Sequence, residues 1–195
     1  MKIQKMIVGA GLALGMASGM ALAHEGDVFV AIDANGKLTF EFDFDAVNLL
    51  APVPIGSSVA GWLGDEPGFA ELGEDEPDEG LFRIDAGANI AFQLVGSDVA
   101  FNVWDPLFNA ILQPGDQFVL GGWGFDDHAF WHIDSDAPGF DPLQTVWSAD
   151  FFIVDLAGIH APSDVVNIKF TNVPAPGAGA MLASVMMFAS RRRRA

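Results

Sequence analysis

Four histidines are the residues of this sequence best suited to bind a metal or to transfer a proton near neutral pH. They are His24, His128, His132 and His160. His128 and His132 lie in the stretch DDHAFWHID, whose aromatic and β-branched residues favour a strand. In a strand both would share one face about 13 Å apart, too far to bind one ion unless the strand bulges. A simple two-histidine site is therefore disfavoured.

His24 gains importance from the segment before it. Residues 1–23 carry Lys2 and Lys5 near their start, continue as an apolar run from Met6 and end in Ala21-Leu22-Ala23. These are the three parts of a secretory signal peptide. The alternative is a membrane-spanning helix, but the run is short, rich in glycine and closes on a cleavage motif. Cleavage after Ala23 would make His24 the first residue of the exported protein.

An N-terminal histidine can hold a metal ion through its α-amine and its imidazole nitrogen together. With His128 or His132 as a further ligand, His24 would resemble the copper-binding histidine brace of lytic polysaccharide monooxygenases and some periplasmic copper carriers. The resemblance covers only these residues and implies copper or zinc as the cofactor. The alternative is that all four histidines are ordinary core or surface residues.

Other catalytic constellations are poorly supported, since the carboxylates are too abundant for a glycosidase-type pair to be diagnostic. No serine has the Gly-x-Ser-x-Gly context of a hydrolase elbow, and no glycine-rich loop has the spacing of a phosphate or dinucleotide site. The chain has no cysteine, which excludes disulfides and thiolate chemistry. We therefore expect a protein that is not an enzyme. Its five tryptophans could stack sugars, but their spread among predicted strands favours core positions.

The charge of the chain is concentrated in its middle. Residues 24–172 contain all 26 acidic residues against three basic ones, Lys37, Arg83 and Lys169, so their formal charge is -23. Such a surface repels nucleic acid and anionic lipid headgroups, and it is compatible with hard cations such as Ca²⁺. The 17 phenylalanines supply a core for one domain, so we do not expect disorder.

This middle segment is predicted to be one all-β domain, an antiparallel β-sandwich or jelly roll. Short apolar stretches are separated by turn-forming residues, and none keeps a helical period over a dozen residues. Asn35-Gly36 is expected to turn the chain between the first two strands. The expected strands are Asp27–Ile32, Leu38–Asp45, Ala88–Val95, Val99–Trp104, Gln117–Leu120, His128–Ile133, Val146–Val154 and Val165–Phe170.

The segment Gly64–Gly80 is expected to be a loop without a strand. It packs eight acidic residues, two prolines and four glycines together, and its carboxylates could bind Ca²⁺. It lacks the Asp-x-Asp-x-Asp spacing that makes a calcium loop specific. A solvated acidic loop is therefore the favoured interpretation.

Residues 173–195 form a separate C-terminal segment. Val173-Pro174-Ala175-Pro176 ends the last expected strand, an apolar run of small residues follows, and the segment closes with Arg191, Arg192, Arg193 and Arg194. As a helix the run would span about 21 Å, less than the hydrocarbon core of about 30 Å. The arginines would stay on the cytoplasmic side of a membrane. A plain C-terminal anchor is one interpretation.

The tail also resembles the sorting signal of the PEP-CTERM family of exported bacterial proteins. In that family Val-Pro-Glu-Pro, a hydrophobic segment and an arginine cluster follow one another. Val173, Pro174, Pro176 and the four arginines match this pattern, whereas Ala175 replaces the glutamate. The resemblance implies processing by an exosortase-like enzyme, in Gram-negative-type bacteria that make exopolysaccharide or biofilm.

The middle domain is also similar to uncharacterised exported domains that combine three features. These are a leading histidine, an Asp-x-Pro-Gly-Phe-like stretch and a later histidine-rich strand. The matching stretches are His24–Asp27, Asp65–Phe69 and His128–His132. This resemblance implies a shared fold but no known chemistry.

Together these features predict a signal peptide over 1–23, an acidic β-domain over 24–172 and a sorting or anchor segment over 173–195. We expect an exported protein of the cell envelope, surface or extracellular matrix, held to the membrane at least transiently. Its expected role is structural or adhesive, with exopolysaccharide, signal peptidase, the Sec machinery and an exosortase-like enzyme as partners. The alternatives are a copper- or zinc-binding protein built on His24, and a carbohydrate-binding module with exposed tryptophans.

Overall fold

The computed structural model describes residues 26–173, and this part of the chain is all-β. The predicted signal peptide with its cleavage residues Ala21 and Ala23, His24 and the tail from Pro174 onward lie outside the described residues. Within them, no helix is long and apolar enough to cross a membrane. The strands are β1 (Val28–Asp33), β2 (Leu38–Glu41), β3 (Val47–Leu49), β4 (Ala51–Pro52), β5 (Gly61–Gly64), β6 (Phe69–Glu71), β7 (Leu81–Phe82), β8 (Ile90–Ser97), β9 (Phe101–Trp104), β10 (Gln117–Gly121), β11 (Asp126–Asp127), β12 (Phe130–Asp134), β13 (Trp147–Asp155) and β14 (Val166–Thr171).

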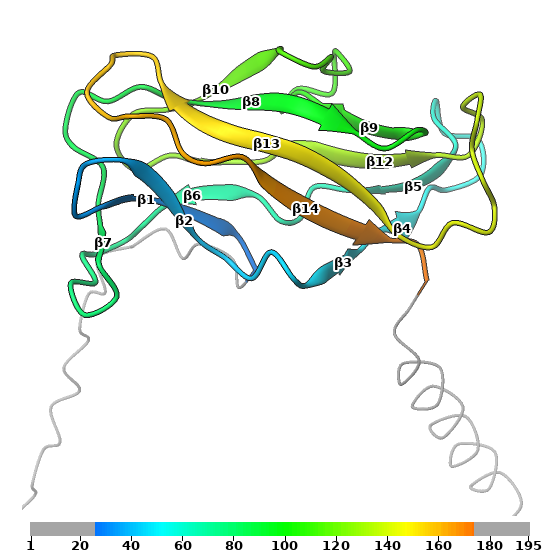
Figure 1. Ribbon diagram of the computed structural model, residues 1–195. Coiled ribbons are helices and arrows are strands. Elements are labelled where there is room, and N and C mark those ends of the chain that lie inside the picture. Colours follow the sequence, from blue (N-terminus) through cyan, green and yellow to red (C-terminus); the bar gives the residue numbers. More distant parts are fainter. Residues whose placement is uncertain (1–25, 174–195) are drawn as a thin grey trace, which may run out of the picture.

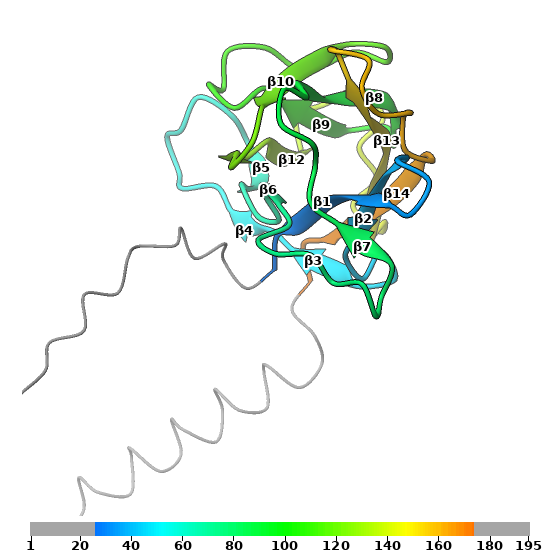
Figure 2. The same ribbon diagram turned by 90° about the vertical axis from the view of Figure 1, so that its left-hand side faces the viewer.

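These strands form three sheets that pack around one core, which confirms the predicted β-sandwich (Figure 1). The first sheet has the order β10-β8-β13-β14-β3, and the second has the order β4-β5-β12-β9. The third runs β11-β6-β1-β2, with β7 also paired to β1. Neighbouring strands are antiparallel except β1–β6 and β14–β3, which are parallel. Figure 2, a view along the strands, shows them enclosing the core.

All eight expected strands are present, with ends that shift by a few residues. The turn at Asn35-Gly36 is also confirmed, since the Gly36 amide donates to the Asp33 carbonyl oxygen at 2.9 Å. Strand β2 ends four residues before the expected Asp45. There the Asp43 carboxylate accepts a hydrogen bond from the Asp45 amide at 3.0 Å, and such a side-chain bond starts a turn.

The expectation that Gly64–Gly80 contains no strand is wrong. Strand β6 lies within it, parallel to β1 and antiparallel to β11, and all three of its residues are buried. Phe69 is fully buried because it belongs to the aromatic core, and this burial outweighs the acidic character of the surrounding sequence. The exposed parts of the segment are Asp65 and Glu66 before β6 and most residues after Leu72.

The core is an aromatic cluster to which every sheet contributes. The Phe92 and Phe151 rings of the first sheet stack at 4.9 Å between centroids. The Phe69 ring of the third sheet lies 5.5 Å from both. Trp131 of the second sheet lies 4.8 Å from the Phe170 ring of the first. Large aromatic rings in mutual contact are the main source of stability in such a core.

Trp131 also makes a polar contact at the edge of this cluster. Its ring is completely buried, and its indole Nε1 donates to the carbonyl oxygen of Pro67 at 3.0 Å. A buried carbonyl without a partner costs free energy, so this bond holds the segment before β6 against the core.

We predict that Trp131→Phe lowers the free energy of unfolding by about 1–3 kcal/mol, because it shrinks a buried ring and leaves the Pro67 carbonyl without its donor. Urea titration followed by circular dichroism measures this change. The matched control is Trp123→Phe, whose ring is 67% exposed and whose effect should stay within about 0.5 kcal/mol. Equal effects of the two variants would contradict the prediction.

Candidate metal centre

The four histidines differ sharply in their surroundings. His132 is buried, its Nδ1 accepts from Trp104 Nε1 at 3.4 Å, and its Nε2 lies 2.8 Å from the Ala60 carbonyl oxygen. His160 is also buried, and its Nε2 accepts from the Asp85 amide at 3.1 Å. Both ring nitrogens of His132 are thus within hydrogen-bond distance of protein atoms. The geometry therefore favours His128 over His132 as the second histidine ligand beside His24.

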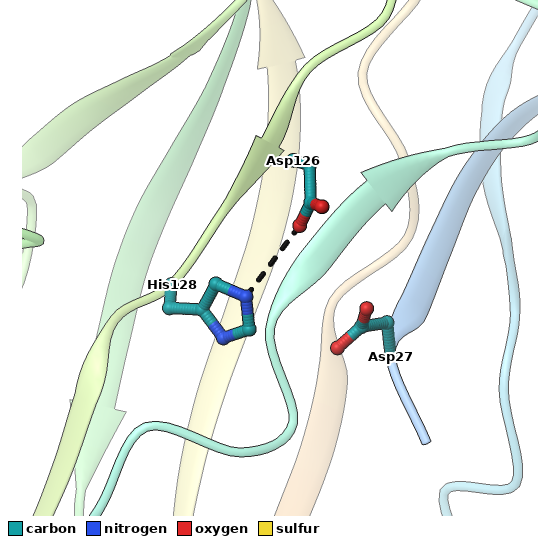
Figure 3. A group of neighbouring side chains, drawn as sticks. All are labelled: Asp27, Asp126 and His128. Carbon is teal, nitrogen blue, oxygen red and sulfur yellow. Dashed lines mark ion pairs between the residues drawn. The ribbon is translucent and has the colours of Figure 1, made fainter. Parts of the chain in front are cut away.

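His128 lies beside two carboxylates, Asp27 and Asp126 (Figure 3). One ligand atom from each of the three residues lies within 4.8 Å of the other two. His128 Nε2 is 3.5 Å from Asp126 Oδ1, and Asp27 is buried to 2% exposure. Among residues 26–173, this is the one group of potential ligands that includes a histidine.

Strand β6 brings these residues together, because it lies between β1 and β11. Phe69 of β6 pairs with Val28 of β1 on one side and with Asp127 of β11 on the other. Asp27 directly precedes β1, while Asp126 and His128 flank Asp127, so the three side chains meet at one end of the same three strands. Figure 3 shows Asp27 at the start of β1 and shows Asp126 and His128 on the same segment of chain, that of β11.

Gly68 occupies the centre of this arrangement. Its amide donates to Asp27 Oδ1 at 3.0 Å, and the Val28 amide donates to its carbonyl oxygen at 2.9 Å. A Cβ at this position would lie 2.4 Å from the His128 ring, closer than atoms can approach. Only glycine lets the imidazole lie against the backbone here.

The carbonyl oxygen of Asp65 orients the His128 ring. It lies 2.9 Å from His128 Nδ1, so a hydrogen on Nδ1 donates to it. In a neutral ring, the lone pair is then on Nε2, which faces the Asp126 carboxylate. Two acceptors facing each other require a proton or a cation between them. Metal-binding histidines are commonly oriented in this way, through a carbonyl on their second nitrogen.

The electrostatics of the cluster favour a positive charge. Burial alone would lower the pKa of His128, but the bond to Asp65 and the carboxylates of Glu66, Asp27 and Asp126 raise it above its usual 6.5. Burial, followed by the negative charge of Asp27, raises the pKa of Glu66 above 4.5. The surplus of carboxylates therefore attracts either a proton or a metal ion to this place.

The acidic loop contributes to a second cluster, formed by Glu41, Glu76 and Glu79. Burial and the charges of Glu76 and Glu79 raise the pKa of Glu41. Carboxylates alone at a partly exposed surface are common without an ion. The Glu41–Glu76–Glu79 cluster thus adds nothing specific to the possibility of Ca²⁺ binding that the loop's composition raised, and a solvated acidic loop stays the favoured interpretation.

Sequence reasoning identified His128 but missed Asp27 and Asp126. The sequence Asp126-Asp127-His128 could have indicated Asp126 as a ligand, since a carboxylate and a histidine two residues apart can share a strand face. Nothing local indicates Asp27, whose place in the cluster depends on the pairing of β1 with β6.

We predict that Gly68→Ala brings the pKa of His128 back toward 6.5 or below, because the added methyl displaces the ring from Asp65 and from the carboxylates. NMR titration of the imidazole measures this. Gly96→Ala is the matched control, since a Cβ there meets nothing within 4 Å, and its His128 should titrate as in the parent protein.

The same titration has a consequence for stability. A histidine whose pKa is raised on folding stabilises the metal-free fold below about pH 6.5, and this contribution is lost as the pH rises through the raised value. A measured pKa of His128 at or below 6.5 in the metal-free parent protein would contradict the prediction that Asp65 and the neighbouring carboxylates raise this pKa.

Comparison of the chain with family models, with curated proteins and with solved structures gives no match to any of them. The resemblance of the tail to the PEP-CTERM family stays a prediction, since of residues 173–195 the structure describes Val173 alone. The function has to be argued from the geometry of the site itself.

Proposed function

We propose that the protein is an exported, metal-binding β-sandwich protein of the bacterial cell envelope or matrix. Asp27, Asp126 and His128 would bind one divalent cation. The observation that carries this proposal is the convergence of three ligand atoms within 4.8 Å of one another, on a histidine already oriented by a backbone carbonyl. Binding, not catalysis, is the proposed activity.

The donor set favours Zn²⁺ over Ca²⁺. Two carboxylates and one imidazole suit Zn²⁺, whereas Ca²⁺ takes oxygen ligands and more of them. Tetrahedral zinc bonds of about 2.0–2.2 Å place two ligand atoms about 3.3–3.6 Å apart. The 3.5 Å between His128 Nε2 and Asp126 Oδ1 fits this spacing. Copper, the other metal predicted from the sequence, would use the same imidazole.

His24 is a candidate for the remaining ligand. It precedes Asp27 by three residues, and three residues of extended chain span at most about 11 Å. If cleavage follows Ala23, the α-amine and imidazole of His24 are within reach of the Asp27–Asp126–His128 cluster. The length of the chain between His24 and Asp27 thus allows the predicted partnership of His24 with His128, which belongs to this proposal.

The proposed location depends on the two ends of the chain. The signal-peptide pattern over residues 1–23 and the PEP-CTERM-like tail support export followed by sorting at the membrane. The last strand, β14, ends at Thr171, so the tail would begin directly after the folded domain. A structural or adhesive role in an exopolysaccharide layer is compatible with export followed by sorting at the membrane. The folded domain would then bind the metal ion in that layer.

We predict that the processed protein binds Zn²⁺, and that Asp126→Asn and His128→Ala each weaken binding at least tenfold, since a tetrahedral site has few ligands to lose. Isothermal titration calorimetry at pH 7.5 measures the affinity. Asp78→Asn is the matched control, because it removes one exposed carboxylate of the acidic loop and should leave binding unchanged.

Two results would overturn the proposal. One is a processed parent protein that binds neither Zn²⁺ nor Cu²⁺; the other is equal affinity of the parent, the Asp126→Asn and the His128→Ala proteins. His24→Ala tests the fourth ligand separately. An unchanged affinity in that variant removes His24 from the site while leaving the other three ligands in place.

We further predict that deleting residues 174–195 changes where the protein accumulates without changing its fold. The described residues end before this segment, so the truncated chain keeps every strand that the structure describes. Cell fractionation with immunoblotting locates the two forms, and circular dichroism compares their folds. Identical fractionation of the truncated and full-length proteins would refute the sorting role of the tail.

A further inference from the structure

Trp123 is the most exposed of the five tryptophans. Its side chain is 67% exposed, whereas Trp131 and Trp147 are completely buried. It lies in a Gly-Gly-Trp-Gly turn between β10 and β11, where Gly121 and Gly124 have φ values of 127° and 79°. These positive values favour glycine, so the turn presents the indole to solvent instead of packing it. An exposed indole offers an apolar surface on which a ligand can stack.

Two further side chains hold this tryptophan in place. The guanidinium carbon of Arg83 lies 4.8 Å from the centre of the Trp123 ring. Glu71, whose side chain is 3% exposed, receives Arg83 Nη2 at 3.3 Å on one carboxylate oxygen and the Gly124 amide on the other. A buried carboxylate therefore fixes both the arginine and the turn that carries the tryptophan.

A pocket of about 130 Å³ opens beside these residues. Arg83, Glu71 and Asp126 line it, and Gly124, next to Trp123, forms part of its wall. Arg83 Nε has no hydrogen-bond partner among the described residues. The pocket thus combines a donor, two carboxylate acceptors and a neighbouring aromatic face.

We propose that this Arg83–Trp123 pocket binds one ring of a neutral hexose polymer. One sugar ring enters the pocket, where its hydroxyls donate to Glu71 and Asp126 and Arg83 donates to its oxygens, while the exposed indole of Trp123, outside the pocket lining, contacts the adjoining part of the sugar chain. The formal charge of -23 over residues 24–172 opposes a polyanionic sugar. A protein partner would need a face of roughly 800 Å², far larger than this pocket and one tryptophan.

The sugar site does not rest on the proposed metal centre. Asp126 lines the pocket and also faces His128, but Arg83, Glu71 and Trp123 are separate from the metal ligands. Binding measured in the presence of EDTA therefore tests the sugar site without metal on the shared residue Asp126, so its result does not depend on whether the protein binds a metal.

The experiment uses the full-length protein in EDTA with cellohexaose, maltohexaose and mannohexaose as probes, and with polygalacturonate as the anionic comparison. Calorimetry is expected to show millimolar or tighter binding of at least one neutral hexaose. Trp123→Ala should weaken it at least tenfold, as expected for an aromatic residue at the centre of a binding site. Leu143→Ala is the matched control, an 86% exposed apolar side chain outside the pocket.

Arg83→Gln is a second variant that leaves Trp123 in the sequence, and it should also weaken binding. The proposal is overturned if no neutral hexaose binds at millimolar concentration, or if only polygalacturonate binds. It is equally overturned if Trp123→Ala and Arg83→Gln, folded as judged by circular dichroism, bind like the parent protein.

Discussion

The hydrogen bond from the Trp131 indole to the Pro67 carbonyl oxygen connects the core to the proposed metal centre. The Trp131 ring contacts aromatic side chains of all three sheets, so its position is determined by the packing of the whole domain. Through Pro67 that packing also positions the neighbouring Asp65 carbonyl, which orients His128. A site held by the core in this way is preorganised, since its ligands need little further ordering to bind an ion.

The second constraint is the central position of β6 in its sheet. This strand has only three residues, yet it pairs with β1 and β11 and carries Phe69 into the aromatic core. The residue before it, Gly68, contacts both Asp27 and the His128 ring. One short strand therefore couples the stability of the core to the geometry of the cluster. Its last residue, Glu71, binds Arg83 and the Gly124 amide at the Arg83–Trp123 pocket.

The long strands were predictable because their apolar residues alternate or run together, as in Val28–Asp33 and Trp147–Asp155. Strand β6 was not, because Phe-Ala-Glu between acidic residues has no period to detect. The stretches quoted for the resemblance to exported domains contain Asp27, Asp65–Phe69 and His128, although that resemblance gave Asp27 no role as a ligand, and the structure brings these residues together. What sequence could not supply was register: Asp27 meets Asp126 only through strand pairings far apart in the chain.

The parallel pairing of β1 with β6 makes the beginning of the domain an interior part of its sheet. The cluster joins residues about 100 positions apart, so it cannot form until the chain has been synthesised at least through His128. For an exported chain, folding is completed outside the cytoplasm, where the supply of metal ions differs. At sites of nitrogen and oxygen ligands Cu²⁺ binds more tightly than Zn²⁺ by general affinity, so the ion that is bound depends on which metals are available. The compartment in which the chain folds, more than its ligands, would then decide which ion it carries.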